Sequence, residues 1–585
     1  MSNGKVLSTS VAIIGGGPVG LMLALFLDRF GVKSTVFNIE KTTRWHPKGN
    51  GQNSRTMEHY RTLGIVDDIR ALGIPGDHPF DHAVFTRLNS HEICRFRRPT
   101  QNERLAIRAT TRPDDQYVEP MYHVNQMYVE RAMHERAKTR PNITLRFGWQ
   151  VDDFMQDADG VTLRARDLDS GVGEIWRASY AAGCDGARGN TRKSLGIRYE
   201  GDVRQTDYFA GLLYSIYMRI PDLLPRFLNH RRAWMYWLIN KDAAGVIISL
   251  NGKDEFMMLA KPNRDQGQMD RDEVRRWMQR AIGEDIPVEI ISYQPWNAGA
   301  ALVAERYFVD RVVLAGDSVH LFTPTGGFGL STGLDDTSNL SWKLAALVQG
   351  WGGPFLLQSY ELERKPVGYR NTGAARKIAM SWHAPQATPN IECEGPEGEA
   401  ERRAAAQSSF VKNNHFFRDE EVDATGVQLG ARYDKSPLIV DDGEPPPENF
   451  DEYFCSGEPG GRAPHLWLDD KHGHGSSLFD QLGPGFTLLR LNDTSIDVTP
   501  LEKVANARGV PFKVLDIAVP EADALYGRKL ALIRPDQYIA WRGNELPLDL
   551  DSLMARVTGH IPPVLAGGSD KAGEKVWLEE PAANF

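Results

Sequence analysis

Hydrophobic runs near the start of the chain alternate with a stretch of helical character. Residues 11–14 are short, apolar and rich in β-branched side chains, glycines follow at once, and residues 21–30 form an apolar helix-like stretch that Gly31 would end. Residues 34–39 have the composition of a second strand. This order of elements predicts a βαβ unit with a parallel sheet.

The centre of the chain has a different pattern. From about Tyr208 to Trp296 aromatic residues are frequent, and strand-like runs such as residues 245–250 occur among them. This pattern predicts an antiparallel sheet with one covered face. Residues 311–315 return to the pattern of a buried strand, residues 122–131 are interpreted as a helix, and a further helix is expected to begin near Leu334.

A polar segment separates these regions from the C-terminal part of the chain. Between about Pro385 and Gln407, proline, glycine, glutamate and alanine dominate, which is typical of a linker or a surface excursion. Three strand-like runs follow, separated by helix-like stretches, and they predict a small α/β unit from about Pro437 to Gly559. The three runs are residues 486–491, 512–517 and 530–534.

Composition places the chain among globular proteins. A length of 585 residues predicts two or three domains, and 41% hydrophobic with 25% charged residues is an ordinary composition. The net charge of −9 gives no basic surface for nucleic acid. The most apolar stretch, residues 11–27, is short for a bilayer span and is interrupted by glycines and Pro18, so we expect no membrane segment.

The cysteines argue against redox or metal chemistry of their own. They are Cys94, Cys184, Cys393 and Cys455. Their wide spacing, with no C-x-x-C pair, disfavours a disulfide framework, a zinc cluster and a thioredoxin-type redox pair. A reducing, cytoplasmic setting fits best, and the C-terminal unit is expected to serve packing or subunit contact without disulfide reductase activity.

A glycine motif at residues 15–20 carries the first chemical signal. The letters GGGPVG fit G-x-G-x-x-G directly after a strand and at the start of a helix. In such a motif Gly15 makes a tight turn, Gly17 lets the backbone approach a pyrophosphate, and Gly20 lets helix and strand pack closely. Glu40, at the end of the second strand, can accept hydrogen bonds from ribose hydroxyls. The motif predicts a dinucleotide site and leaves open whether NAD or FAD occupies it.

Two later segments narrow that choice. Residues 183–192 follow a strand and contain a turn at Asp185-Gly186 beside two arginines. Residues 314–333 contain a strand that ends in Gly316-Asp317, then a glycine-rich loop and the start of a helix. Backbone N–H groups at a helix N-terminus favour negative charge.

The three segments together resemble the aromatic-ring hydroxylase family of single-component FAD monooxygenases, and the resemblance covers nearly the whole chain. Further segments also match the family pattern, and the last two resemble the phenol hydroxylase branch. These further segments are residues 52–58, 126–130, 336–344, 461–465 and 534–542.

This resemblance implies an α/β fold with three parts. A Rossmann-like FAD-binding domain would be interleaved with an antiparallel-sheet substrate domain, and a thioredoxin-like α/β domain would follow at the C-terminus. The FAD-binding domain would comprise residues 1–77, 118–203 and 300–385, and the substrate-binding domain residues 78–117 and 204–299. A linker would run over residues 386–435 and the thioredoxin-like domain over residues 436–585.

The resemblance also implies the cofactor and the reaction. NADH or NADPH would dock transiently and reduce FAD, O₂ would add to give a C4a-hydroperoxide, and a small aromatic substrate would be hydroxylated. A homodimer is possible, and neither nucleic acid nor a membrane is expected as a partner. Pro324 would lie by the reactive edge of the flavin. The residues expected to bind FAD are Gly15, Gly17, Gly20, Glu40, Lys48, Gln126, Asp185, Asp317, Gly329, Leu330, Ser331 and Thr332.

The chain departs from the family pattern at three positions. Lys48 stands where Arg is usual, and Ser331 where Asn is frequent. Asn50 stands where phenol hydroxylase relatives have Asp or His as the base, and an amide cannot accept a proton near neutral pH. The substrate would then be already anionic, or another group would act as base. The candidates are His46, Tyr217 and Tyr236.

Other interpretations remain open at this point. The same cofactor could support Baeyer–Villiger insertion or epoxidation, and a flavin-binding protein without turnover is the non-enzymatic alternative. His46 and His320 are more often structural than catalytic in such contexts. Trp342 fits core packing, and the pair Arg231-Arg232 fits a solvated surface, although it could meet a substrate carboxylate.

Overall fold

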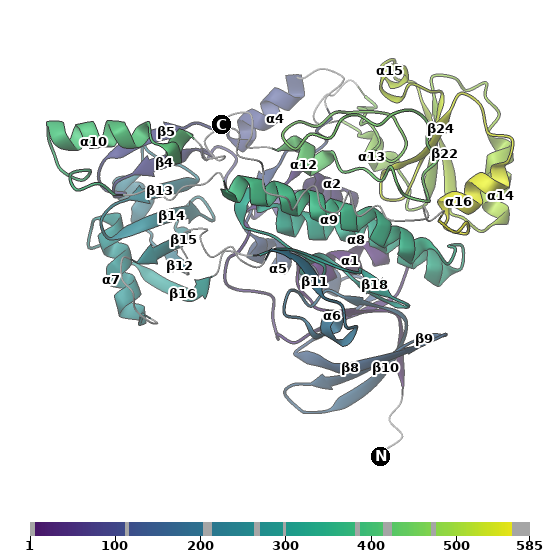
Figure 1. The fold of residues 1–585 in the computed structure, drawn as a ribbon, viewed down its shortest axis with the longest axis horizontal. Coiled ribbons are helices and arrows are strands. Elements are labelled where there is room, and N and C mark those ends of the chain that lie inside the picture. Colours follow the sequence, from purple (N-terminus) through teal and green to yellow (C-terminus); the bar gives the residue numbers. More distant parts are fainter. Residues whose placement is uncertain are drawn as a thin grey trace.

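The computed structural model describes residues 6–110, 116–202, 213–262, 269–296, 300–380, 387–412, 424–469 and 475–563. Two long helices, α8 (Phe328–Gln349) and α9 (Leu356–Met380), run through the centre of the molecule. The middle sheet lies at one end of these helices and the C-terminal unit at the other (Figure 1). No helix in the described ranges is long and apolar enough to cross a bilayer.

The first sheet contains the predicted βαβ unit. Its strand order is β18-β19-β10-β1-β2-β7, and β1, β2, β7, β10 and β19 run parallel. Helix α1 (Pro18–Arg29) connects β1 to β2 and packs against α8 and against α5 (Gln126–Lys138). The strands are β1 (Leu7–Ile14), β2 (Ser34–Asn38), β7 (Ile143–Phe147), β8 (Trp149–Asp157), β9 (Gly160–Asp167), β10 (Gly173–Gly183), β18 (Phe308–Val309) and β19 (Val312–Leu314).

The middle sheet is predominantly antiparallel, with strand order β16-β12-β15-β14-β13-β4-β5. One face is covered by α7 (Arg271–Ile282), whose Val274 and Trp277 share a core cluster with Tyr236. The opposite face packs against side chains of the first domain, such as Met57. Both faces are therefore buried, and the prediction of a single covered face was wrong. The strands are β4 (His82–Phe85), β5 (Glu92–Phe96), β12 (Leu213–Arg219), β13 (Met235–Ile239), β14 (Ala243–Ser249), β15 (Glu255–Pro262) and β16 (Glu289–Trp296).

Tyr208, with which the predicted central sheet was expected to begin, lies outside the described residues. Two small sheets are separate from the larger ones: β11, β17 and β20 form one, and β3 pairs with β6 in the other. Their strands are β3 (Gly51–Gln52), β6 (Tyr122–His123), β11 (Tyr199–Asp202), β17 (Ala301–Ala304) and β20 (His320–Leu321).

The C-terminal unit is a four-stranded sheet of order β22-β21-β23-β24. Strands β21 and β22 are parallel and are connected through α14, whereas β23 and β24 pair antiparallel, which is a thioredoxin-like arrangement. With the first two sheets it confirms the predicted α/β fold class. All four cysteines of the chain are free. The elements are β21 (Phe486–Leu491), α14 (Thr499–Ala507), β22 (Phe512–Ile517), α15 (Ala522–Tyr526), β23 (Leu530–Ile533), β24 (Ile539–Gly543) and α16 (Leu550–Val557).

Two helices begin at residues other than those expected. Helix α8 starts at Phe328, six residues before Leu334, because Gly326 and Gly327 adopt φ of +74° and +67° and complete the turn that precedes it. Helix α5 starts at Gln126, because the Asn125 side chain accepts a hydrogen bond from the Met127 N–H at 3.0 Å and caps the helix.

The polar segment after α9 is more structured than a linker. Its described part contains α10 (Pro396–Ala406) and α11 (Ser409–Lys412), and Phe410 packs edge-on against Trp237 of the middle sheet at 5.6 Å between ring centroids. Residues 413–423 of the predicted linker lie outside the described residues. The remaining helices are α2 (Ser54–Thr62), α3 (Val66–Ala71), α4 (Gln101–Thr110), α6 (Asn190–Ser194), α12 (Thr425–Leu429) and α13 (Leu478–Gln481).

Candidate flavin site and active site

The three motif glycines have the distinct surroundings that a dinucleotide loop requires. A Cβ on Gly15, whose φ is +113°, would lie 2.3 Å from the Cys184 carbonyl oxygen, and a Cβ on Gly20 would lie 1.9 Å from the Gly15 carbonyl oxygen. Around Gly17, at the N-terminus of α1, the same test finds no atom within 4 Å. Two glycines therefore permit close packing, and the third leaves open space beside a helix N-terminus, where a phosphate is stabilised.

The end of β2 contributes a side chain that the sequence did not single out. The Asn38 side-chain oxygen accepts a hydrogen bond from the Gly16 N–H at 3.0 Å and holds the glycine loop. Glu40 lies two residues beyond the strand and is exposed, and its carbonyl oxygen accepts from Asn38 and from the Gly148 N–H. The Glu40 carboxylate remains available for a ribose.

Asp185 has a structural task in the second motif. Its carboxylate accepts hydrogen bonds from the Thr191 N–H and hydroxyl, both at 2.9 Å, and from the Ser318 hydroxyl at 3.3 Å. The Gly186 N–H in turn donates to Ser318 at 3.0 Å. Asp185 therefore connects this motif to the loop that contains Asp317, and we expect it to act on a cofactor through that loop.

The Gly316-Asp317 turn is held by a hydrogen bond to a side chain of α8. The Gly316 N–H donates to Asp336 at 3.1 Å, and the same carboxylate oxygen accepts from His320 Nε2 at 2.8 Å. His320 is fully buried in this contact, which agrees with a structural role. The Asp317 side chain is exposed, on the side where Tyr199 donates to its carbonyl oxygen at 2.6 Å. Its carboxylate is thus exposed rather than used in packing.

The first turn of α8 contains the predicted residues Gly329 to Thr332. The first N–H groups of a helix have no partner within the helix, so they point into the space beyond its end. The Ser331 hydroxyl is buried and has no hydrogen-bond partner among the described residues. Thr332, in contrast, donates to the Phe328 carbonyl at 2.8 Å. Pro324 stands just before this turn, where the chain enters it.

Lys48, Asn50 and Gln126 are brought together by α5. The Gln126 N–H donates to the Gly49 carbonyl at 2.8 Å, and its side chain donates to Glu130 at 2.6 Å. Burial and Arg44 lower the pKa of the Lys48 ammonium, while Asp317 and Glu130 act in the opposite direction. Lys48 is thus within electrostatic reach of Asp317.

Asn50 is tied to a neighbour that the sequence analysis did not identify. The Asn125 side-chain N–H donates to the Asn50 side-chain oxygen at 2.6 Å. Asn125 is also the cap of α5, and an Asn directly before a helix is a signal that could have identified it. This contact fixes the orientation of the Asn50 amide.

His46 is held by the middle sheet. Its Nδ1 and Nε2 atoms lie 2.7 Å and 2.9 Å from the hydroxyls of Ser292 on β16 and Ser215 on β12. Burial, together with Arg44 and Lys48, lowers the pKa of His46 to about 4. The ring is therefore neutral near pH 7, and both of its nitrogens are engaged.

The two tyrosines lie on opposite faces of the middle sheet. Tyr217 packs on the face towards α8, and its hydroxyl donates to Glu255 at 2.6 Å, as does that of Tyr128 at 2.5 Å. Burial and Glu255 raise the pKa of Tyr217. Tyr236 packs on the other face with α7, and its hydroxyl accepts from the Ala233 N–H at 2.8 Å. The face of the sheet that packs against α8 is the opposite one, which argues against Tyr236 as the base.

The C-terminal motifs provide buried ion pairs to the first domain. Arg534 donates to both oxygens of Glu363 on α9 at 2.7 Å and 2.8 Å, and Lys343 on α8 donates to the same carboxylate at 2.6 Å. Burial alone would raise the pKa of Glu363, but Arg534 and Lys343 hold it below its usual range. The Trp342 side chain next to Lys343 is fully buried, as predicted.

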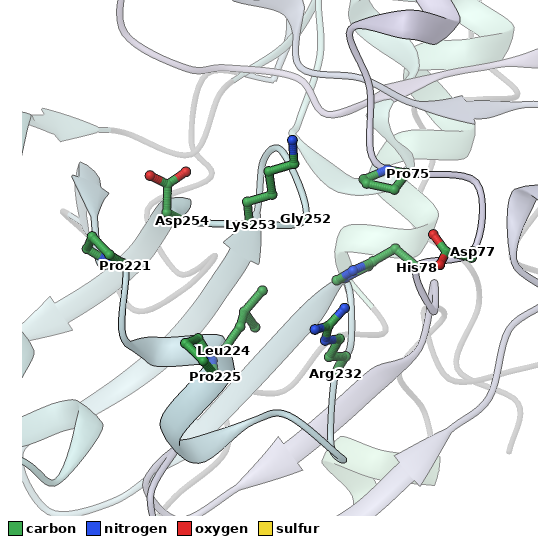
Figure 2. A pocket seen from close by; sticks show the side chains of 10 residues that line it. All are labelled: Pro75, Asp77, His78, Pro221, Leu224, Pro225, Arg232, Gly252, Lys253 and Asp254. Carbon is green, nitrogen blue, oxygen red and sulfur yellow. The ribbon is translucent and has the colours of Figure 1, made fainter.

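A separate cavity of about 360 Å³ lies beside the loops at one end of the middle sheet, after β12, before β13 and between β14 and β15 (Figure 2). Figure 2 shows His78 and Arg232 on one side of it and Pro221 and Asp254 on the other. Of the described residues, none of those expected to bind FAD lines this cavity. Arg231, next to Arg232, donates to the carbonyl oxygens of Ser90, Leu88 and Phe227, so it is structural rather than a substrate ligand.

The residues present fit an FAD. The open space at Gly17 suits a pyrophosphate, the exposed Asp317 carboxylate suits a polyol, and the first turn of α8 with the orphaned Ser331 hydroxyl suits the polar edge of a ring. The fold and this site therefore define a protein of the FAD-binding oxidoreductase class.

Comparison with known proteins identifies the family. The FAD binding domain family matches residues 8–375, and the family described as aromatic-ring hydroxylase, C-terminal, matches residues 456–560. The chain belongs to the FAD-dependent aromatic-ring hydroxylase family. FAD is accordingly its cofactor, and its class is that of the flavoprotein monooxygenases.

The relatives cover almost the full length of the chain. An FAD-dependent monooxygenase, apdD of Emericella nidulans, is 30% identical over 98% of this chain and 93% of its own. A 2,4-dichlorophenol 6-monooxygenase of Cupriavidus pinatubonensis is 29% identical over 94% of this chain and 97% of its own. Among solved structures, the rebeccamycin biosynthetic enzyme RebC with reduced flavin has a TM-score of 0.82 at 32% identity, covering 95% of this chain and 100% of that one.

Proposed function

We propose that this chain uses NADH or NADPH and O₂ to hydroxylate a small phenolic substrate. One observation carries the proposal. Leu330, in the first turn of α8, packs into the same cluster as Trp237 and Met257 on the inner face of the middle sheet. The first turn of α8 thus packs into the apolar, aromatic cluster on the inner face of the middle sheet, and such surroundings would suit a flat aromatic ring.

The relatives support this substrate class. Two of the relatives, at 28–29% identity, act by their names on phenols, and another relative at 29% identity is named for polyketides. The two relatives that are named for phenols have a phenolic ring as the common group of their substrates. We therefore propose a phenol, and we extend the proposal to no particular ring system.

The protein residues have four tasks in this reaction. Bound FAD would supply the redox chemistry with O₂. The first turn of α8 would stabilise negative charge on the flavin through its free N–H groups, and the cluster around Trp237 would exclude water from the reacting ring. Asp317 and Lys48 would hold the polar chain of the cofactor. Pro324 would shape the entry to the ring.

The proton of the substrate hydroxyl has two candidate acceptors among the described residues. The His46 ring is neutral near pH 7 and could accept a proton, but both of its nitrogens already contact serine hydroxyls. Tyr217 is linked to Glu255, which could accept a proton through the tyrosine hydroxyl. Asn50 would donate a hydrogen bond to the substrate oxygen and take no proton. We propose that an ionised phenol is the form that reacts.

A homodimer stays a prediction.

The test is coupled turnover with a panel of phenols and aromatic acids. We expect a phenol to accelerate oxidation of NADH or NADPH, with one O₂ consumed and one hydroxylated product and one water formed per nicotinamide when coupling is complete. Product is identified by mass spectrometry as the substrate plus one oxygen atom. Nicotinamide oxidation that no aromatic compound stimulates, or product carrying oxygen from water rather than from ¹⁸O₂, would refute the proposal.

A further inference from the structure

A chain of buried ion pairs, formed by six charged side chains, connects the C-terminal domain to the flavin loop, by which we mean the turn at Gly316-Asp317. Each member contacts the next through its side chain, and every one of them is at most 9% exposed. In order of contact, the members are Arg462, Glu58, Arg55, Asp335, Arg364 and Asp336.

The first half of the chain crosses the domain boundary. Arg462, in the C-terminal part, makes two contacts with Glu58 on α2, at 2.5 Å and 3.1 Å. Glu58 also accepts from Arg55 at 2.9 Å, and Arg55 Nε lies 3.6 Å from Asp335 on α8. Arg55 is held to the C-terminal domain a second time, because it donates to the Asp536 carbonyl at 2.8 Å.

The second half of the chain ends at the flavin loop. Arg364 on α9 bridges Asp335 and Asp336, and it also donates to the Thr332 carbonyl at 3.2 Å in the first turn of α8. Asp336 then accepts from the Gly316 N–H at 3.1 Å, directly before Asp317. The chain therefore reaches both segments that would hold the flavin.

The charges alternate in sign along the whole chain. Each inner ion lies between two ions of opposite charge, in a region from which water is excluded, so a shift of one is opposed by both neighbours. Removal of Arg462 would leave Glu58 to attract Arg55 alone. Arg55 would then move from Asp335, Arg364 would turn towards the less neutralised Asp335, and its hold on Asp336 would weaken.

We propose that the C-terminal domain is a positioning element for the flavin, which acts through this chain on the Gly316-Asp317 turn and the first turn of α8. The C-terminal domain has no pair of redox-active cysteines. The proposal instead gives its buried arginines a role in the oxidoreductase. Arg462 is a positioning residue in this proposal, because its own contacts are with Glu58 and not with the cofactor site. The proposal rests on FAD binding and is independent of the substrate.

The experiment compares Arg462→Gln with Arg542→Gln. Arg542 pairs with Asp442 at 2.7 Å and is also buried, but it does not belong to the series of ion pairs from Arg462 to Asp336. We measure the melting temperature, the dissociation constant of FAD by flavin fluorescence, and the midpoint potential of the bound flavin. Both variants should melt earlier, whereas Arg462→Gln alone should raise the FAD dissociation constant at least fivefold and shift the potential.

Two further variants keep the test decisive. Arg462→Lys retains the charge and loses one of the two contacts, so it should recover part of the affinity, and it replaces the glutamine variant if that one does not fold. Glu58→Gln should reproduce the effect of Arg462→Gln on the flavin. Unchanged FAD affinity and potential in Arg462→Lys and Glu58→Gln, with melting lowered as in Arg542→Gln, would overturn the proposal. Failure of substrate hydroxylation would leave these readouts unaffected.

Discussion

The orphaned hydroxyl of Ser331 predicts opposite effects of one substitution on the apoprotein and the holoprotein. A buried polar group without a partner costs about 1–3 kcal/mol, and a hydrogen bond contributes about 0.5–1.5 kcal/mol net. In the apoprotein, Ser331→Ala removes the cost, and a gain of about 1 kcal/mol should raise the melting temperature by about 1 °C, because the unfolding entropy of a chain of 585 residues is large. In the holoprotein, the same change removes a donor to the flavin edge, and it should weaken FAD binding about twofold to tenfold.

The assay uses apoprotein prepared by removal of FAD, with thermal melting monitored by tryptophan fluorescence and FAD titrated by flavin fluorescence. Ser341→Ala is the matched control, because Ser341 is buried on the same helix but donates to the Ser338 carbonyl at 3.2 Å. The control should melt slightly earlier and bind FAD normally. If Ser331→Ala lowers the melting temperature of the apoprotein and leaves FAD affinity unchanged, the assignment of this hydroxyl to the flavin is refuted.

Four further outcomes follow from individual residues. Asp317→Asn should raise the FAD dissociation constant about tenfold or more in a fluorescence titration, because a hydrogen bond to a charged acceptor contributes about 1.5–3 kcal/mol. Asn50→Asp should make the hydroxylation rate less dependent on the acidity of the phenol, as followed by stopped-flow across pH; an unchanged profile would contradict a direct contact. Glu363→Gln leaves the buried Lys343 ammonium without its carboxylate partner, although Asp536 still pairs with Arg534, and should lower the free energy of unfolding by about 3–5 kcal/mol in urea titrations. The pKa of His46 is about 4 in the folded protein and 6.5 in the unfolded chain, so the unfolded chain binds the proton at higher pH. Up to about 3 kcal/mol of the free energy of unfolding should therefore be lost as pH falls from 6.5 to 4. The His46→Gln variant should show a smaller loss.

Local backbone chemistry explains what the sequence could predict. The requirement for glycine at Gly15 and Gly20 comes from neighbouring backbone atoms within one βαβ unit, so the motif alone contains the constraint. Strands β21 and β22 have the bounds that their runs of residues indicate: β21 is a mostly buried run, and β22 is a mostly half-buried run that ends at the buried Ile517. The positions of these segments therefore followed from patterns of a few residues.

Long-range packing explains what the sequence could not predict. The second face of the middle sheet is covered by side chains such as Met57 and Phe410, which come from segments far from the sheet in sequence. The roles of Arg462 and Arg534 were equally hidden. Their motifs marked a family, but a salt bridge depends on partners more than a hundred residues away, which no spacing rule contains.

The orientation of Asn50 gives the missing base a physical interpretation. Asn125 donates to the Asn50 oxygen, so the acceptor of the Asn50 amide is occupied and its own N–H groups are left for other contacts. A pair of N–H donors stabilises an oxyanion and offers nothing to a proton. A site of this kind favours the ionised form of a phenol. No base in the protein then removes the proton, and whether the substrate is ionised depends on the pKa of the phenol itself. If the proposed function holds, Asn50 would restrict which phenols react rather than abolish the reaction, and acidic phenols should be the preferred substrates.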